Sequence, residues 1–147
     1  MIVEELIDAI EIPFRYVVVT ESTPIREIIE DMIAGRDDRV VYVVDGNNRL
    51  EGIISLGDLV RHYRADRIPR RGSWFPSAGM LRYLTAETAG DIMKKKFVSC
   101  RSGDDVEDVL SRMVSRDIMI KVIPVLDEEG RIVAALDILD ILKNFSR

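Results

Sequence analysis

The chain has very little thiol and imidazole chemistry, since its 147 residues include one cysteine, Cys100, and one histidine, His62. A single cysteine excludes an intramolecular disulfide and is typical of a reducing compartment. One thiol and one imidazole are also too few for a structural zinc site. Because the sequence shows no recognisable pairing of a nucleophile with a base, we expect neither a catalytic site nor a bound metal.

Long hydrophobic runs are also missing. No apolar stretch approaches the roughly 20 residues that a membrane-spanning helix needs. The N-terminal MIVEELIDAI lacks the basic start and the cleavage site of a signal peptide. We therefore expect a cytoplasmic protein without a membrane span. With 47% apolar and 32% charged residues, the composition is that of a globular protein that buries one core or two small ones.

A strong charge of one sign is absent overall, since the net charge is −5, but the charge is unevenly distributed. Between residues 61 and 96, nine basic residues stand against three acidic ones, a local balance of +6 that leaves −11 for the remainder. This division argues against a protein that coats nucleic acid. The basic stretch can still meet a phosphate or an acidic partner, and nucleic-acid binding through its arginines is kept as an alternative.

The most informative feature that is present is an internal repeat. The segment VVYVVDGNNRLEGIISLGDLV, residues 40–60, returns as VIPVLDEEGRIVAALDILDIL, residues 122–142, and Asp58 matches Asp140. Upstream, five apolar residues with helical spacing match five others: Ile25, Ile28, Ile29, Met32 and Ile33 against Val106, Val109, Leu110, Met113 and Val114. A repeat of this size indicates two copies of one supersecondary unit that complete each other's core, with a cleft between them.

Hydrophobic periodicity and turn signals predict the same order of elements in each copy, preceded by a leading helix over residues 3–10. The first copy is expected to continue with a strand over 14–20, a helix over 25–33, strands over 40–44 and 50–54, and a helix that opens at Ser55. The second copy is expected to have a strand over 97–100, a helix capped by Asp104 with Glu107, strands over 118–126 and 131–136, and a final helix that opens at Asp137.

The fold class that follows is α/β, more narrowly α+β, with two β-α-β-β-α repeats packed sheet to sheet in pseudo-two-fold symmetry. We expect residues 1–64 to form the first repeat with its leading helix, 65–88 an inserted linker, and 89–147 the second repeat. The insert carries the single tryptophan, Trp74, among other hydrophobic residues. We expect the insert either to cover apolar surface on one repeat or to act as a lid or docking segment.

Three short motifs resemble the cystathionine-β-synthase (CBS) domain. GIISLGDL, residues 52–59, resembles its signature of a hydrophobic strand, Ser or Thr, two variable residues, Asp and a hydrophobic residue. IPVLD, residues 123–127, resembles the strand end of the family, with Pro, Val, a hydrophobic residue and Asp. Asp91-Ile92-Met93 followed by Phe97-Val98-Ser99 is similar to the usual entry into a repeat. The two copies together resemble a tandem CBS pair, also called a Bateman module.

This resemblance implies a regulatory protein without enzymatic activity. CBS pairs bind adenosine-containing ligands (AMP, ADP, ATP, S-adenosylmethionine or NAD) in the cleft between their repeats, and they commonly form homodimers. The ligand would bias one conformation of the pair, and a separate effector protein would respond to that change. The resemblance requires no cofactor for chemistry, because the adenosine ligand is itself the regulator, with Mg²⁺ as a candidate companion ion.

In the family, the Asp of the Ser/Thr-x-x-Asp motif holds the ribose hydroxyls and basic residues reach the phosphates. The resemblance gives the ribose role to Asp58 and Asp140. It places Ser55 and Asp137 at the helix starts, and Ser99 and Val18 at the position beside the adenine base. It makes Arg39, Lys121 and Arg61 the candidates for binding phosphate. Asp137 stands where a hydroxyl is expected, and a carboxylate at a helix N-terminus repels phosphate. We therefore expect the second site to be weaker, adapted to a less charged ligand, or dependent on a cation.

Each of these residues also has a simpler interpretation. Ser55 and Asp58 together can form only the capping box of a helix. Arg39 and Lys121 can be solvated strand ends, and the run Lys94-Lys95-Lys96 is interpreted as an exposed turn. The whole chain can then be a structural dimerisation module with vestigial sites, which is the alternative to ligand binding.

Overall fold

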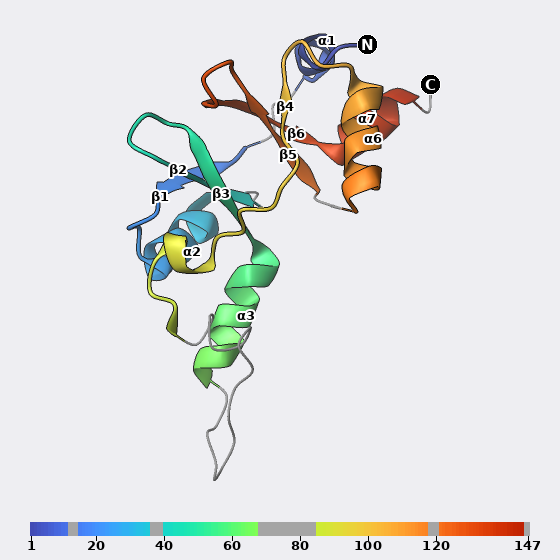
Figure 1. Cartoon of the computed structure of the whole chain (residues 1–147). Helices are drawn as coiled ribbons and strands as arrows, with labels where there is room; N and C mark the ends of the chain where they lie inside the picture. The colour runs from blue at the N-terminus through green and yellow to red at the C-terminus, as the bar shows by residue number, and fades with distance from the viewer. Residues whose placement is uncertain (12–14, 36–39, 68–84, 118–120, 146–147) are drawn as a thin grey trace. The chain divides into compact units, whose positions relative to one another are not determined.

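The computed structural model describes residues 1–11, 15–35, 40–67, 85–117 and 121–145. The chain divides into two compact units (Figure 1). We call them the first-repeat unit, Tyr16–Asp45 with Glu51–Lys95, and the second-repeat unit, Met1–Arg15, Gly46–Leu50 and Lys96–Arg147. Among the described residues, no helix is both long and apolar enough to cross a membrane.

The first repeat forms a three-stranded sheet with two helices. Its elements are β1 (Val17–Thr20), α2 (Ile25–Gly35), β2 (Val40–Val44), β3 (Leu50–Ser55) and α3 (Leu56–Arg67). The strand order is β1-β2-β3, and β1 runs parallel to β2 with Val17 opposite Val41. All five residues of β2 are buried, because this strand lies in the centre of the sheet. Its uninterrupted VVYVV sequence matches that position.

The second repeat forms a sheet of the same topology. Its elements are β4 (Cys100–Arg101), α6 (Val106–Arg116), β5 (Val122–Leu126), β6 (Ile132–Asp137) and α7 (Ile138–Phe145). The order is β4-β5-β6, with β4 parallel and β6 antiparallel to the central β5. The predicted α+β class with two β-α-β-β-α repeats is confirmed.

Two predicted details of the second repeat are wrong. The strand expected over 97–100 is reduced to Cys100–Arg101, so Phe97 and Ser99 lie outside the ladder. The N-cap of α6 is Asp105 instead of Asp104, because the Asp105 carboxylate accepts the N–H of Glu107 at 2.8 Å. Asp104 instead accepts hydrogen bonds from the Arg101 N–H and from the Arg112 side chain, each at 3.0 Å.

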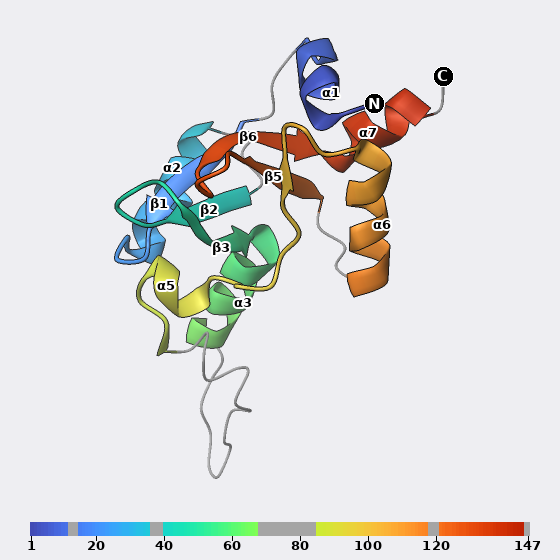
Figure 2. The ribbon, with the colours of Figure 1, turned by 45° about the horizontal axis from the view of Figure 1, so that its top comes forward.

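The short helices that lead into the repeats pack in an exchanged manner. Helix α1 (Val3–Ala9) precedes the first repeat in sequence, yet it contributes Val3 and Leu6 to the core of the second-repeat unit. Helix α5 (Ala89–Ile92) precedes the second repeat, yet it contributes Ala89 and Ile92 to the core of the first-repeat unit (Figure 2). The sequence boundary at residue 64 groups α1 with the first repeat, whereas its buried side chains belong to the second.

Equivalent backbone hydrogen bonds hold the two exchanged helices. The Val3 N–H donates to the Asp104 carbonyl at 2.8 Å, and the Ala89 N–H donates to the Thr23 carbonyl at 2.9 Å. Both acceptors lie in the turn before the first long helix of a repeat. Helix α5 ends after four residues, whereas α1 has seven. The C-cap residues, Met93 of α5 and Ile10 of α1, both have an extended backbone. The next residue is Lys94 in the first-repeat unit and Glu11 in the second-repeat unit.

The burial of Cys100 leads to a testable prediction. Its side chain is 2% exposed, and burial, reinforced by the Asp104 charge, raises the pKa of the thiol from 9.0 to about 12. A shift of this size lowers the thiolate fraction at pH 8 roughly a thousandfold. We therefore expect the native thiol to resist alkylation by iodoacetamide, with the urea-unfolded chain as the reactive control. Mass spectrometry of both samples measures this difference, and equal alkylation rates would contradict it.

Candidate functional site

The Asp58 carboxylate is the only buried charged group in the described core, with 0% of the residue exposed. It lies in the first turn of α3, directly after Ser55 ends β3. Its Oδ2 accepts hydrogen bonds from the Ser55 N–H and the Ser55 hydroxyl, both at 3.0 Å. The Asp58 N–H in turn donates to the Ser55 hydroxyl at 3.4 Å. The two residues thus form the reciprocal cap that the sequence allows, and this cap fixes the orientation of the carboxylate.

The second oxygen of Asp58 faces two cations. Lys94 Nζ lies 3.3 Å from Oδ1, and Arg61 Nη1 lies 3.5 Å from the same atom. The Lys94 side chain is 46% exposed and that of Arg61 57% exposed, so both charged groups reach solvent. The arrangement therefore combines one buried, oriented carboxylate with two accessible cations, which is suitable for a ligand that carries both hydroxyls and anionic groups.

Lys94 reaches this position because its backbone pairs with β3. The Ile53 N–H donates to the Lys94 carbonyl at 2.9 Å, and the Lys94 N–H donates to the Ile53 carbonyl at 2.8 Å. Gly52 makes the close approach possible, since a Cβ at this position would lie 2.7 Å from the sulfur of Met93. The glycine of the GIISLGDL motif thus allows the segment after α5 to pack along β3 and to bring Lys94 to Asp58.

The start of α7 has a different arrangement. Asp137 ends β6, and its Oδ1 accepts the Leu139 N–H at 2.9 Å, so Asp137 alone caps the helix. The Lys121 carbonyl accepts the Ile138 N–H at 2.9 Å, which places this predicted phosphate residue beside the same helix start. Asp140, the counterpart of Asp58, is half-buried and takes no part in that cap.

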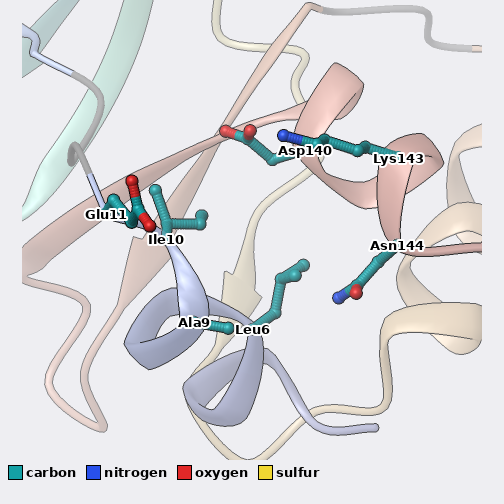
Figure 3. Close-up of a pocket in the computed structure, with 7 residues that line it drawn as sticks. All are labelled: Leu6, Ala9, Ile10, Glu11, Asp140, Lys143 and Asn144. Carbon is teal, nitrogen blue, oxygen red and sulfur yellow. The ribbon is translucent and has the colours of Figure 1, made fainter. Parts of the chain in front are cut away.

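The Asp140 side chain instead lines a cavity of about 410 Å³ in the second-repeat unit (Figure 3). The lining residues come from α1, α7 and the residues after α1: Leu6, Ala9, Ile10, Glu11, Asp140, Lys143 and Asn144. Two carboxylates and one ammonium thus surround this space. Figure 3 shows the Lys143 amine directed toward the Asp140 side of the cavity. The two repeats therefore present unequal surroundings to corresponding aspartates.

The structure brings together some of the predicted site residues. Ser55, Asp58 and Arg61 form one cluster, and Asp137 and Lys121 meet at the start of α7. Val18 lies on β1 and Ser99 just before β4, and neither takes part in the hydrogen bonds described above. Arg39 and most of the insert, including Trp74, lie outside the described residues.

Sequence reasoning missed Lys94, because three consecutive lysines are typical of an exposed turn. The local pattern contains no sign of the pairing with Ile53.

Comparison with known proteins agrees with this architecture. The chain is 30% identical over 136 residues to the magnesium transporter MgtE of Thermus thermophilus, of which it spans 25%. The crystal structure of a CBS-domain-containing protein of Thermotoga maritima is 27% identical and has a TM-score of 0.71, with 98% of this chain and 93% of that chain covered. The cytosolic domain of the Mg²⁺ channel MgtE in complex with ATP is 31% identical with a TM-score of 0.62, covering 88% of this chain and 44% of that one.

The family assignment rests on both repeats. The family model of the CBS domain matches residues 6–65 and again residues 89–147, which together make up most of the chain. These segments contain the end of α1, all of α5, the two sheets and both Asp58 and Asp140. The chain therefore belongs to the CBS domain family and carries two copies of the domain.

Proposed function

We propose that this chain is a regulatory module that binds an adenosine-containing ligand at the start of α3. The observation that carries the proposal is Asp58, a fully buried carboxylate that is oriented by Ser55 and flanked by two accessible cations. A carboxylate can accept hydrogen bonds from both hydroxyls of a ribose, while Lys94 and Arg61 supply charge for phosphates. The ATP complex of the MgtE cytosolic domain supports this proposal, because that domain is 31% identical to the chain.

A homodimer is part of the same proposal. Helix α3 exposes Leu56, Val60 and Tyr63, which recur along one face at the spacing of an amphipathic helix. Helix α7 exposes Leu139 and Leu142. Contiguous apolar side chains on a helix surface are typical of protein contacts. A second copy of the chain would bury the exposed face of α3 or that of α7, since each copy carries both.

The remaining parts of the proposal concern output. A module of this kind acts by favouring one conformation when ligand is bound, and an effector protein responds to that change. We propose that the chain is not itself an enzyme, because the Asp58 cluster contains carboxylate, hydroxyl and cations in binding and capping roles. Its expected location remains the cytoplasm, since a single cysteine without a disulfide is typical of a reducing compartment.

A thermal-shift screen tests the proposal. AMP, ADP, ATP, S-adenosylmethionine and NADH are added separately to the full chain, and the melting temperature is recorded against ligand concentration. A ligand that binds only the folded chain stabilises it by about 2.7 kcal/mol at a hundred times its Kd. We expect at least one of the five to do so, with the corresponding guanosine nucleotide as a control for base selectivity.

Flat melting curves for all five ligands would favour a second candidate function, a structural dimerisation module. One observation supports that candidate, since the hydrogen bonds from Ser55 to Asp58 are sufficient to explain the motif as a helix cap. Retention on RNA with a steep salt dependence would instead favour nucleic-acid binding through the basic stretch.

A further inference from the structure

In the structure, both oxygens of the Asp58 carboxylate already have partners. Oδ2 accepts two hydrogen bonds from Ser55, and Oδ1 lies within 3.5 Å of both Lys94 and Arg61. A ribose that binds to this carboxylate must therefore take over Oδ1, because the Ser55 bonds hold Oδ2 at the helix start. The ammonium and the guanidinium must then move away from Oδ1.

The backbone of each cation is fixed, but its charged group is free to move. The Lys94 backbone is fixed on both sides by its hydrogen bonds to Ile53, but its side chain is nearly half exposed. Arg61 lies on the exposed side of α3, three residues after Asp58. Both charged groups can therefore turn from Oδ1 toward solvent without any change in the backbone. Once displaced from Oδ1, the ammonium and the guanidinium need a new anionic partner close to the ribose.

We propose that Lys94 is the specificity-determining residue of this site and selects phosphorylated nucleosides over uncharged ones. This inference rests on the proposed function. Without ligand, Lys94 neutralises the Asp58 carboxylate. When a nucleotide binds, the ribose hydroxyls take Oδ1 and the 5′-phosphates take Lys94 and Arg61. An unphosphorylated nucleoside displaces the same ion pairs but offers the cations no anion in return, so it binds less tightly.

The second repeat provides an internal comparison. Its leading helix is longer by three residues, and Glu11 takes the position after the C-cap that Lys94 holds in the other unit. Glu11 and Asp140 line the same cavity. A carboxylate in this position repels phosphates, whereas an ammonium attracts them. The charge of this residue is thus one difference between the surroundings of Asp58 and those of Asp140, beside the exchange of Ser55 for Asp137.

The test is isothermal calorimetry of the full chain with adenosine, AMP and ATP. For the wild type we expect affinity to rise in that order. In Lys94→Gln, ATP should bind more weakly while adenosine binds as well or better, because Oδ1 is then less occupied. The ratio of ATP to adenosine affinity should fall by about 10- to 100-fold, the range expected for a charge-assisted hydrogen bond. Lys94→Arg keeps the charge and should restore most of the ratio.

Lys96→Gln is the matched control, since it removes the same charge from the same lysine run. Lys95 is less suitable as a control, because its charge acts on Glu51. The hydrogen bond between Glu51 and Glu21 raises the pKa of Glu51, and the nearby Lys95 charge opposes this rise. An equal loss of ATP and adenosine affinity in Lys94→Gln, or a ratio like that of Lys96→Gln, would overturn the role of Lys94 alone. A wild type that binds none of the three ligands would overturn the role of Lys94, whereas the proposed function fails only if S-adenosylmethionine and NADH also leave the melting temperature unchanged.

Discussion

Replacement of Ile92 by alanine should destabilise the first-repeat unit by about 2–5 kcal/mol, the range for truncation of a buried isoleucine. Ile92 is 0% exposed and packs in the core formed by α2, β2 and β3, although it precedes the second repeat in sequence. The cavity left by the lost side chain would lie beneath α5, which has four residues and little stability of its own. Urea unfolding of the full chain measures the loss.

Hydrogen exchange shows where the Ile92→Ala variant loses protection. The exchanged packing predicts the greatest loss in β2 and β3, and a smaller one in β5 and β6. Ile33→Ala on α2 is the matched control, because Ile33 is 69% exposed and the same substitution there should cost little. Greater loss in β5 and β6 than in β2 would contradict the assignment of α5 to the first core.

Much of the fold is predictable because each repeat has strong local patterns. The buried strand β2 follows from its five consecutive apolar residues, and α2 follows from apolar residues spaced along one helix face. Both predicted hairpins agree with the observed strands within one or two residues where the chain is described, since the turn residues between the strands tolerate positive φ angles. Asn48 and Gly130 have such angles, at 64° and 82°.

The exchange of α1 and α5 could not be predicted, because it depends on tertiary packing alone. An amphipathic helix reveals which of its faces is buried but not which core covers that face. Val3 and Leu6 are equally suitable for either core by sequence. The short β4 has the same cause: Phe97–Ser99 has the composition of a strand, yet only Cys100 and Arg101 pair with β5. Strand propensity depends on the neighbouring strand.

The candidate site was predictable only in part, for a related reason. Asp58 and Ser55 lie three residues apart, so their contact follows from the helix itself. Lys94 reaches them across a long separation in sequence, through backbone pairing with Ile53 and the space left by Gly52. Local patterns therefore identify the anionic half of the cluster but miss one of its cations.

Replacement of Asp58 by alanine should affect both stability and binding. The Ser55 hydroxyl still accepts the N–H of residue 58 in the variant, but the two hydrogen bonds that Oδ2 accepts from Ser55 are lost. Their loss should lower the free energy of unfolding by about 1–3 kcal/mol. Its ion pairs with Lys94 and Arg61 add little, because both cations are about half exposed and remain solvated in the variant. If the ribose contact is real, ATP affinity should fall by about 10- to 100-fold, since a hydrogen bond to a charged acceptor is lost.

Asp140→Ala is the matched control, because it removes the corresponding carboxylate from α7. The cap of that helix comes from Asp137, which remains in the variant, so stability should change less than in Asp58→Ala. ATP affinity should also change less, since Glu11 in the Asp140 cavity disfavours phosphates. Equal effects of the two substitutions on ATP binding would mean that the repeats bind alike. Unchanged ATP affinity in a folded Asp58→Ala variant would restrict the carboxylate to its role as a helix cap.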